Sequence, residues 1–122
     1  MRFPTTPEHF EYFKERCVYW IEKLKCDDWD WGFIHGKLGL CLAQFDISYT
    51  GRGIDVTLNL KWNEPPTEKR LDRVAFHEVY EGGVLSTLRA YALMTISTDT
   101  VNEETHRIVR KMENFLLGYD TR

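Results

Sequence analysis

The chain has 122 residues, of which 43% are hydrophobic and 14% aromatic, so it can form one packed domain and is too short for two. Its 16 basic and 19 acidic residues give a formal net charge of -3, without a basic block that would follow a nucleic-acid backbone. No apolar run approaches the ~20 residues of a membrane span or forms a secretory signal, so we expect a single cytoplasmic domain over residues 1–122.

The first predicted element is an amphipathic helix from Pro7 to about Lys25. Apolar side chains recur in this segment at helical spacing, with charged side chains between them. Thr6 and Pro7 are typical of a helix start, because threonine caps the first turn and proline fits the first helical position.

A small β-sheet is predicted after this helix. In "GIDVTLNLKW" apolar and polar residues alternate, which indicates a half-buried strand. The segment "LCLAQFDISY" also favours an extended chain, and "TGRG" supplies the turn of a hairpin between the two. A shorter strand around residues 31–35 would complete a mostly antiparallel sheet of about three strands, which the prolines of "NEPPTEKR" end.

Two helices complete the predicted order of helix, small sheet, helix and helix, which is an α+β fold. The first runs from about Glu68 to Leu93, and the second reaches about Leu117. Asp99 or Thr100 is expected to cap the last helix at its start, and Gly118 to end it.

The segment "AFHEVYEGG", residues 75–83, carries the polar groups of greatest chemical interest. On a helical wheel Glu81 lies about 40° from His77, in the middle of an apolar face that includes Leu88, and Glu78 lies at the rim of this face. A buried carboxylate costs several kcal/mol unless it is paired or binds a metal. An ordinary ion pair with His77 or an arginine would satisfy Glu81, so both a structural pair and a metal site remain open.

Two glycines follow this motif inside the predicted helix. Gly82 and Gly83 each cost about 1 kcal/mol relative to alanine in a helix interior. They lie on the side away from His77, so we expect another element, with the first helix as a candidate, to approach closely there.

The last helix offers a third ligand. His106 is expected about 120° from the centre of its apolar stripe and Glu104 about 80° away on the other flank, so either side chain could project toward a neighbouring site. Zinc hydrolases use three protein ligands, and the third often comes from a helix downstream of the H-E helix. Glu113, nearer the end of the helix, is expected to be solvated.

The runs "RVAFHEVYEGGVLSTLRAYA" and "NEETHRIVRKMENFLLG" resemble a family of small phage and prophage metallopeptidases of the zincin type. These proteins share the order helix, short sheet, H-E helix and final helix, so the resemblance implies a minimal zincin-like domain. In the wider group the helix reads H-E-x-x-H, and a glutamate on the final helix completes the metal site. In this chain Glu81 stands at the position of the second histidine.

Alignment of the pair Ile108–Val109 with its counterpart on the family's final helix puts His106 at the place of the glutamate ligand. The resemblance therefore implies that His77, Glu81 and His106 bind Zn²⁺ or another divalent metal, with ligand types exchanged between the two helices. Zinc accepts nitrogen and oxygen ligands at similar distances, so it tolerates this exchange. An alignment shifted by one turn would make Glu103 or Glu104 the third ligand.

The resemblance implies hydrolysis of a protein or peptide substrate. The metal would lower the pKa of its bound water toward about 7, and Glu78 would accept the proton as general base. If the strand Ile54–Leu60 lies at the sheet edge beside the metal, it could pair with an extended substrate. The alternative is a catalytically inactive zincin-fold interaction module of phage origin, but an intact Glu78 favours the enzyme.

Overall fold

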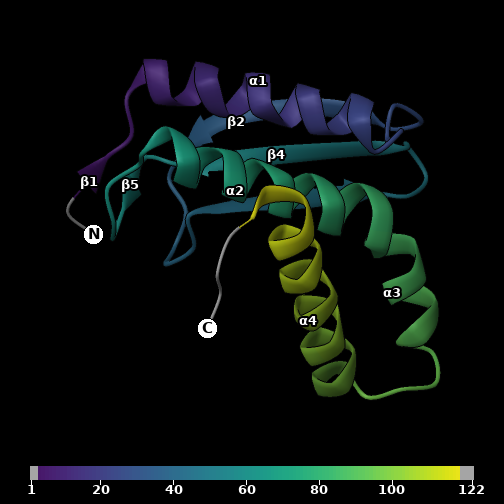
Figure 1. Cartoon of the computed structure of the whole chain (residues 1–122). Coiled ribbons are helices and arrows are strands. Elements are labelled where there is room, and N and C mark those ends of the chain that lie inside the picture. The colour runs from purple at the N-terminus through teal and green to yellow at the C-terminus, as the bar shows by residue number, and fades with distance from the viewer. Residues whose placement is uncertain (1–2, 119–122) are drawn as a thin grey trace.

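The computed structural model describes residues 3–118, which form two small sheets and a set of helices (Figure 1). The helices are α1 (Pro7–Lys23), α2 (Glu68–Val79), the π-helical segment η1 (Tyr80–Leu85), α3 (Ser86–Ala92) and α4 (Thr98–Leu117). The strands are β1 (Phe3–Pro4), β2 (Asp30–Gly36), β3 (Ala43–Ser48), β4 (Gly53–Asn59) and β5 (Lys61–Trp62). The predicted α+β class and order of elements are confirmed.

The larger sheet has the strand order β2-β4-β3. Strands β3 and β4 form the predicted antiparallel hairpin, whereas β2 runs parallel to β4. A second, antiparallel pairing joins β1 to β5, so the sheets are mostly antiparallel, as predicted. The proposed position of β4 at a sheet edge is wrong, because β2 and β3 pair with it on both sides and leave no room for a substrate strand.

Helices α1 and α2 pack side by side and contact the larger sheet (Figure 1). Ile54, Val56 and Leu58 of the predicted alternation are fully buried in the core, whereas Leu60, just after β4, is 41% exposed. Burial of each such side chain contributes about 1.5–3 kcal/mol to folding. This core fixes α2, and therefore the H-E motif, against the sheet.

Asn59 departs from the alternation, as Thr57 also does, since it is buried although its position in the pattern predicts a solvated side chain. Its Oδ1 accepts a hydrogen bond of 3.2 Å from the backbone N–H of Leu38, and its Nδ2 donates one of 2.8 Å to the carbonyl of Cys41. These bonds satisfy the buried amide and hold the segment that leads into β3.

The ends of the helices agree with the sequence at two of three predicted positions. The Thr6 hydroxyl accepts a 3.1 Å hydrogen bond from the backbone N–H of His9 at the start of α1, and Gly118 ends α4 with a left-handed φ of 70°. The predicted cap of α4 at Asp99 or Thr100 is wrong. Ser97 caps this helix, because its hydroxyl accepts from the Thr100 N–H at 3.3 Å.

The predicted helix over residues 68–93 is continuous, but the π-helical segment η1 interrupts its α-helical geometry. A π turn holds one residue more than an α turn, so the side chains that follow are rotated by about 100° from their expected direction. Leu88, predicted on the face of His77, is accordingly 66% exposed. Ser86, the first residue of α3, donates a hydrogen bond from its hydroxyl to the Gly82 carbonyl of this segment.

The two glycines of η1 lie against the sheet region. A Cβ atom on Gly82 would lie 3.2 Å from Phe45 of β3, and one on Gly83 would lie 2.9 Å from Trp31 of β2 and 3.0 Å from the Cys26 sulfur. The expected close approach is confirmed, but the partners are the sheet and the segment before β2 instead of α1.

Gly83→Ala is expected to lower the free energy of unfolding by about 1 kcal/mol or more in urea denaturation. Crowding of a packed core costs about 1–3 kcal/mol, which exceeds the ~1 kcal/mol that alanine gains in a helix. Thr87→Ala is the control, because Thr87 is exposed on the next turn and should change stability by less than about 0.5 kcal/mol. A Gly83→Ala variant as stable as the wild type would contradict the close contact.

Candidate metal centre

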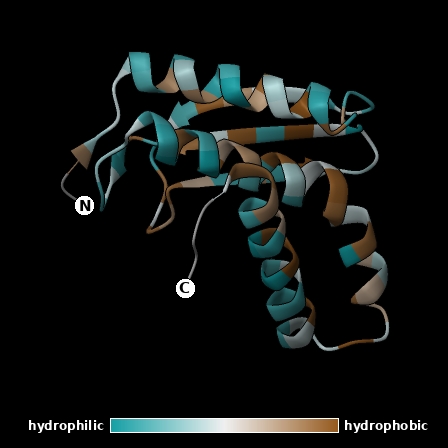
Figure 2. Cartoon of the chain, viewed as in Figure 1, coloured by the Kyte–Doolittle hydropathy of each residue, from teal (hydrophilic) through white to brown (hydrophobic). Residues whose placement is uncertain are grey.

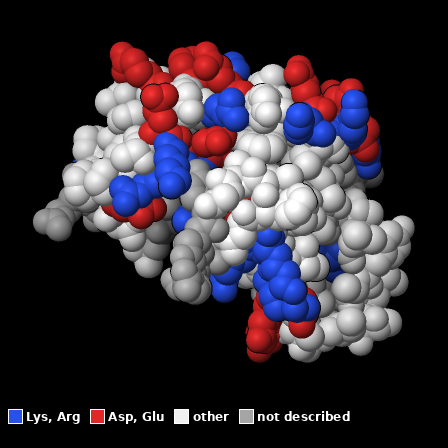
Figure 3. Space-filling view, in the orientation of Figure 1, with Lys and Arg blue, Asp and Glu red and all other residues white. Residues whose placement is uncertain are grey.

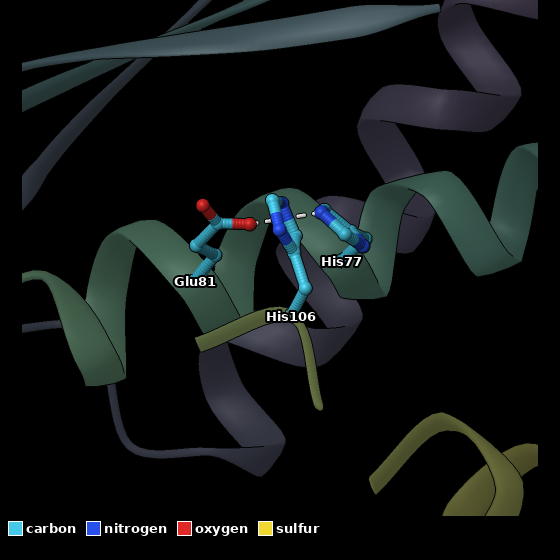
Figure 4. Close-up of side chains that lie close together, drawn as sticks. All are labelled: His77, Glu81 and His106. Atoms are coloured by element: carbon cyan, nitrogen blue, oxygen red, sulfur yellow. Dashed lines mark ion pairs between the residues drawn. The ribbon is translucent and has the colours of Figure 1, made fainter. Parts of the chain in front are cut away.

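Three candidate ligands from neighbouring helices converge at one point (Figure 4). His77 lies in α2, Glu81 in η1 and His106 in α4, and one donor atom of each lies within 4.8 Å of the other two. Small side-chain rotations would bring these atoms onto one ion with bonds of about 2.0–2.2 Å. Two imidazoles and a carboxylate are a usual donor set for divalent transition metals, so this group could bind a metal ion.

The other two candidates for the third ligand lie elsewhere. Glu103 and Glu104 are exposed, and the Glu104 carboxylate is 2.6 Å from the guanidinium of Arg107. Among residues 3–118, the cluster of possible metal ligands consists of His77, Glu81 and His106. The alignment that selects His106 therefore agrees with the arrangement of α4 against α2.

In this arrangement His77 and Glu81 form an ion pair, with 2.8 Å between Nε2 and the carboxylate oxygen. Burial alone would lower the pKa of His77, but the carboxylates of Glu113, Glu81 and Glu78 raise it to about 10. Burial would likewise raise the pKa of Glu81, but the hydrogen bond from His77 and the charges of His77, His106 and Arg89 lower it. Without a metal, a proton on His77 thus holds the two ligands together.

Zinc binding to the metal-free protein at pH 7 should release at least about one proton, because His77 binds metal only as the neutral imidazole. Since the His77 pKa is raised to about 10, the proton competes with the metal below this value, and zinc affinity should rise about tenfold per pH unit between pH 7 and 8. Calorimetric titrations in buffers of different ionisation enthalpy measure the released protons. Zinc binding without proton release would contradict the assignment of His77 as a ligand.

Glu113 is a part of the site that the sequence analysis missed, because it was expected to be solvated. It is buried, and its carboxylate lies 3.8 Å from His77 Nδ1 and 3.9 Å from Arg73 Nε. A carboxylate on the far nitrogen of a metal-binding histidine orients the ring and raises its basicity. The spacing from His106 to Glu113 is two helical turns, which places both on one face of α4 and could have revealed the role of Glu113.

Glu113→Gln is expected to weaken zinc binding by about 10–100-fold, since partners of metal-binding histidines typically have effects of this size. Glutamine keeps the shape of the side chain and removes only its charge. The dissociation constant is measured by competition with a chelator, and Glu103→Gln, an exposed site on the same helix, is the control. Equal zinc affinity in the two variants would contradict a role of Glu113 in orienting His77.

Glu78 is 7% exposed and lines a pocket of about 230 Å³ together with His77. Burial raises the pKa of Glu78, the charge of His77 lowers it and that of Glu81 raises it, and the result is a pKa of about 7. A carboxyl with such a pKa can take up and release a proton at neutral pH, which is the property of a general base.

The opposite wall of this pocket is the start of β3 and the segment before it. Cys41, Leu42 and Ala43 line it across from Arg73 and Val74 of α2. Strand β3 stands at one end of the strand order, so within residues 3–118 one of its edges has no partner strand in this sheet.

Comparison of the chain with models of known protein families, with characterised proteins and with solved structures finds no match. Among the described residues, no helix is long and apolar enough to cross a membrane. The assignment of function therefore depends on the chemistry of the cluster and its surroundings.

Proposed function

We propose that this protein is a zinc-dependent peptidase of the zincin type, related to the small phage and prophage metallopeptidases that its helices resemble. His77, Glu81 and His106 hold the metal in this proposal, and Glu78 is the general base. The observation that carries it is the convergence of three metal-binding side chains beside a buried carboxyl on the same helix. A metal retained for structure alone would have no use for Glu78.

The division of roles follows from the environment of each group. A zinc ion bound by three protein ligands with one open position polarises a carbonyl and lowers the pKa of water toward about 7. Glu78, enclosed in the pocket next to His77, accepts a proton from the water that attacks the peptide carbonyl. It then delivers this proton to the leaving amine. Glu113 keeps His77 oriented through its Nδ1 side.

An extended substrate fits this site along the edge of β3, which replaces the earlier candidate β4. Backbone hydrogen bonds to a sheet edge give affinity for a peptide without requiring a particular sequence. The residues at the start of β3 line the pocket of His77 and Glu78, so a peptide paired there would pass the metal centre.

The test is cleavage of a random peptide mixture, read by mass spectrometry, with tag-free protein that has been loaded with one equivalent of zinc. We expect new peptide termini that disappear with a chelator and return with added zinc. Stoichiometric zinc binding without any cleavage would contradict peptidase activity and leave the non-catalytic interaction module as the function.

A further inference from the structure

A groove of about 190 Å³ runs between α3 and α4, and its walls are mostly apolar. Leu88, Ile96 and Ile108 line it and are 66%, 48% and 40% exposed, so the described side chains leave it open. Apolar residues also predominate along α3 and the segment that follows (Figure 2), and in Figure 3 the surface over α3 is mostly white, with one small blue area. Exposed apolar surface of this kind is typical of a binding site.

Arg89 provides a cation in this apolar groove. Its Nη2 donates to Asn102 Oδ1, while its Nε is buried without a hydrogen-bond partner in residues 3–118. Glu104 also lines the groove, but it is paired with Arg107, so it does not neutralise Arg89.

The groove is lined by residues of η1 and α4, the elements that also carry Glu81 and His106. Side chains of a helix lean toward its N-terminus, so Arg89 of α3 reaches back toward η1, and its charge acts on the Glu81 carboxylate. On the other wall, Thr105 lines the groove and is the neighbour of His106. The groove and the metal centre therefore share two elements, η1 and α4.

We propose that this groove binds the C-terminal residue of the substrate, with a large apolar side chain between α3 and α4 and the α-carboxylate on Arg89. An apolar cavity of about 150 Å³ holds benzene, so the groove has room for the benzyl group of phenylalanine. Guanidinium groups bind carboxylates through strong, charge-assisted hydrogen bonds. This inference rests on the proposed peptidase function for the nature of its ligand, a peptide.

The test is an NMR titration of the zinc-free protein with N-acetyl-phenylalanine, N-acetyl-phenylalaninamide and N-acetyl-alanine. Removal of zinc prevents direct binding of the carboxylate to the metal. We expect N-acetyl-phenylalanine to shift the amide resonances of α3 and α4 and to bind about tenfold or more tightly than either analogue. Shifts outside these helices, or equal binding of the acid and the amide, would overturn the proposal.

Two variants separate the two halves of the proposed subsite. Arg89→Met replaces the guanidinium cation by an uncharged side chain of similar length. It should abolish the preference for the acid over the amide. Ala92→Phe fills the groove and should abolish binding of both phenylalanine compounds. A preference for the acid that survives in Arg89→Met would overturn the role of Arg89, and absence of zinc-dependent cleavage would overturn the peptidase function without altering this titration.

Discussion

Replacement of Glu78 by glutamine is expected to reduce kcat for peptide cleavage by about 10²–10⁴-fold while the protein still binds one equivalent of zinc. Glutamine has nearly the shape of glutamate but cannot accept a proton. Since Glu78 is 7% exposed and carries a pKa raised to about 7, the neutral side chain should also be accommodated in the fold without loss of stability. Zinc content and cleavage rate are measured on the same preparation.

The control for this variant is Glu103→Gln, which removes an exposed carboxylate that lies outside the cluster and outside the groove. It should keep both zinc and the full cleavage rate. If Glu78→Gln cleaved peptides at the wild-type rate, Glu78 would not be the general base. If it lost its zinc as well, the effect on cleavage would belong to the metal site instead of proton transfer.

Replacement of His106 by alanine is expected to weaken zinc binding on the order of 10²–10³-fold, which corresponds to the loss of one of three protein ligands. His106 is exposed on α4, so alanine should leave the fold intact and circular dichroism should not change. Cleavage should be lost at zinc concentrations that saturate the wild type. The dissociation constant is measured by competition with a chelator.

The competing assignments of the third ligand make natural controls for this experiment. Glu103→Ala and Glu104→Ala should bind zinc like the wild type, because neither residue belongs to the cluster. Undiminished zinc affinity in His106→Ala, together with loss in either glutamate variant, would mean that the alignment of the last helix is shifted by one turn.

Local sequence patterns predict much of the fold. The alternation in β4 predicts the burial of Ile54, Val56 and Leu58, and Thr6 marks the start of α1, because both signals act between residues that are close in the chain. The pairing order of strands is different, since it depends on contacts between distant segments. No local pattern indicated that β2 would pair beside β4 and enclose it, so the substrate edge was assigned to the wrong strand.

The π-helical segment explains the largest local error. A wheel with constant rotation places His77, Glu81 and Leu88 on one face, and the extra residue in η1 turns Leu88 out to solvent. The position of Glu81 was predicted well because it comes at the start of that segment. The same rotation turns Leu88 of α3 toward the apolar groove, and α4 forms the other wall of this groove.

The sequence predicts the three candidate metal ligands but not the residues that surround them. His77 and Glu81 follow from helical spacing, and the resemblance supplied the choice of His106. Glu113 was missed because its buried environment arises only when α4 packs against α2, with Arg73 and His77 beside its carboxylate. Its spacing of two helical turns from His106 is the one signal in the sequence, and burial itself is decided by long-range packing.

The most direct test of the central claim is anomalous X-ray diffraction at the zinc edge from crystals of the tag-free, zinc-loaded protein. We predict one zinc ion at about 2.0–2.2 Å from a nitrogen of His77, a nitrogen of His106 and a carboxylate oxygen of Glu81. A zinc ion bound elsewhere, or bound to His77 with Glu103 or Glu104 in place of His106, would contradict the proposed site.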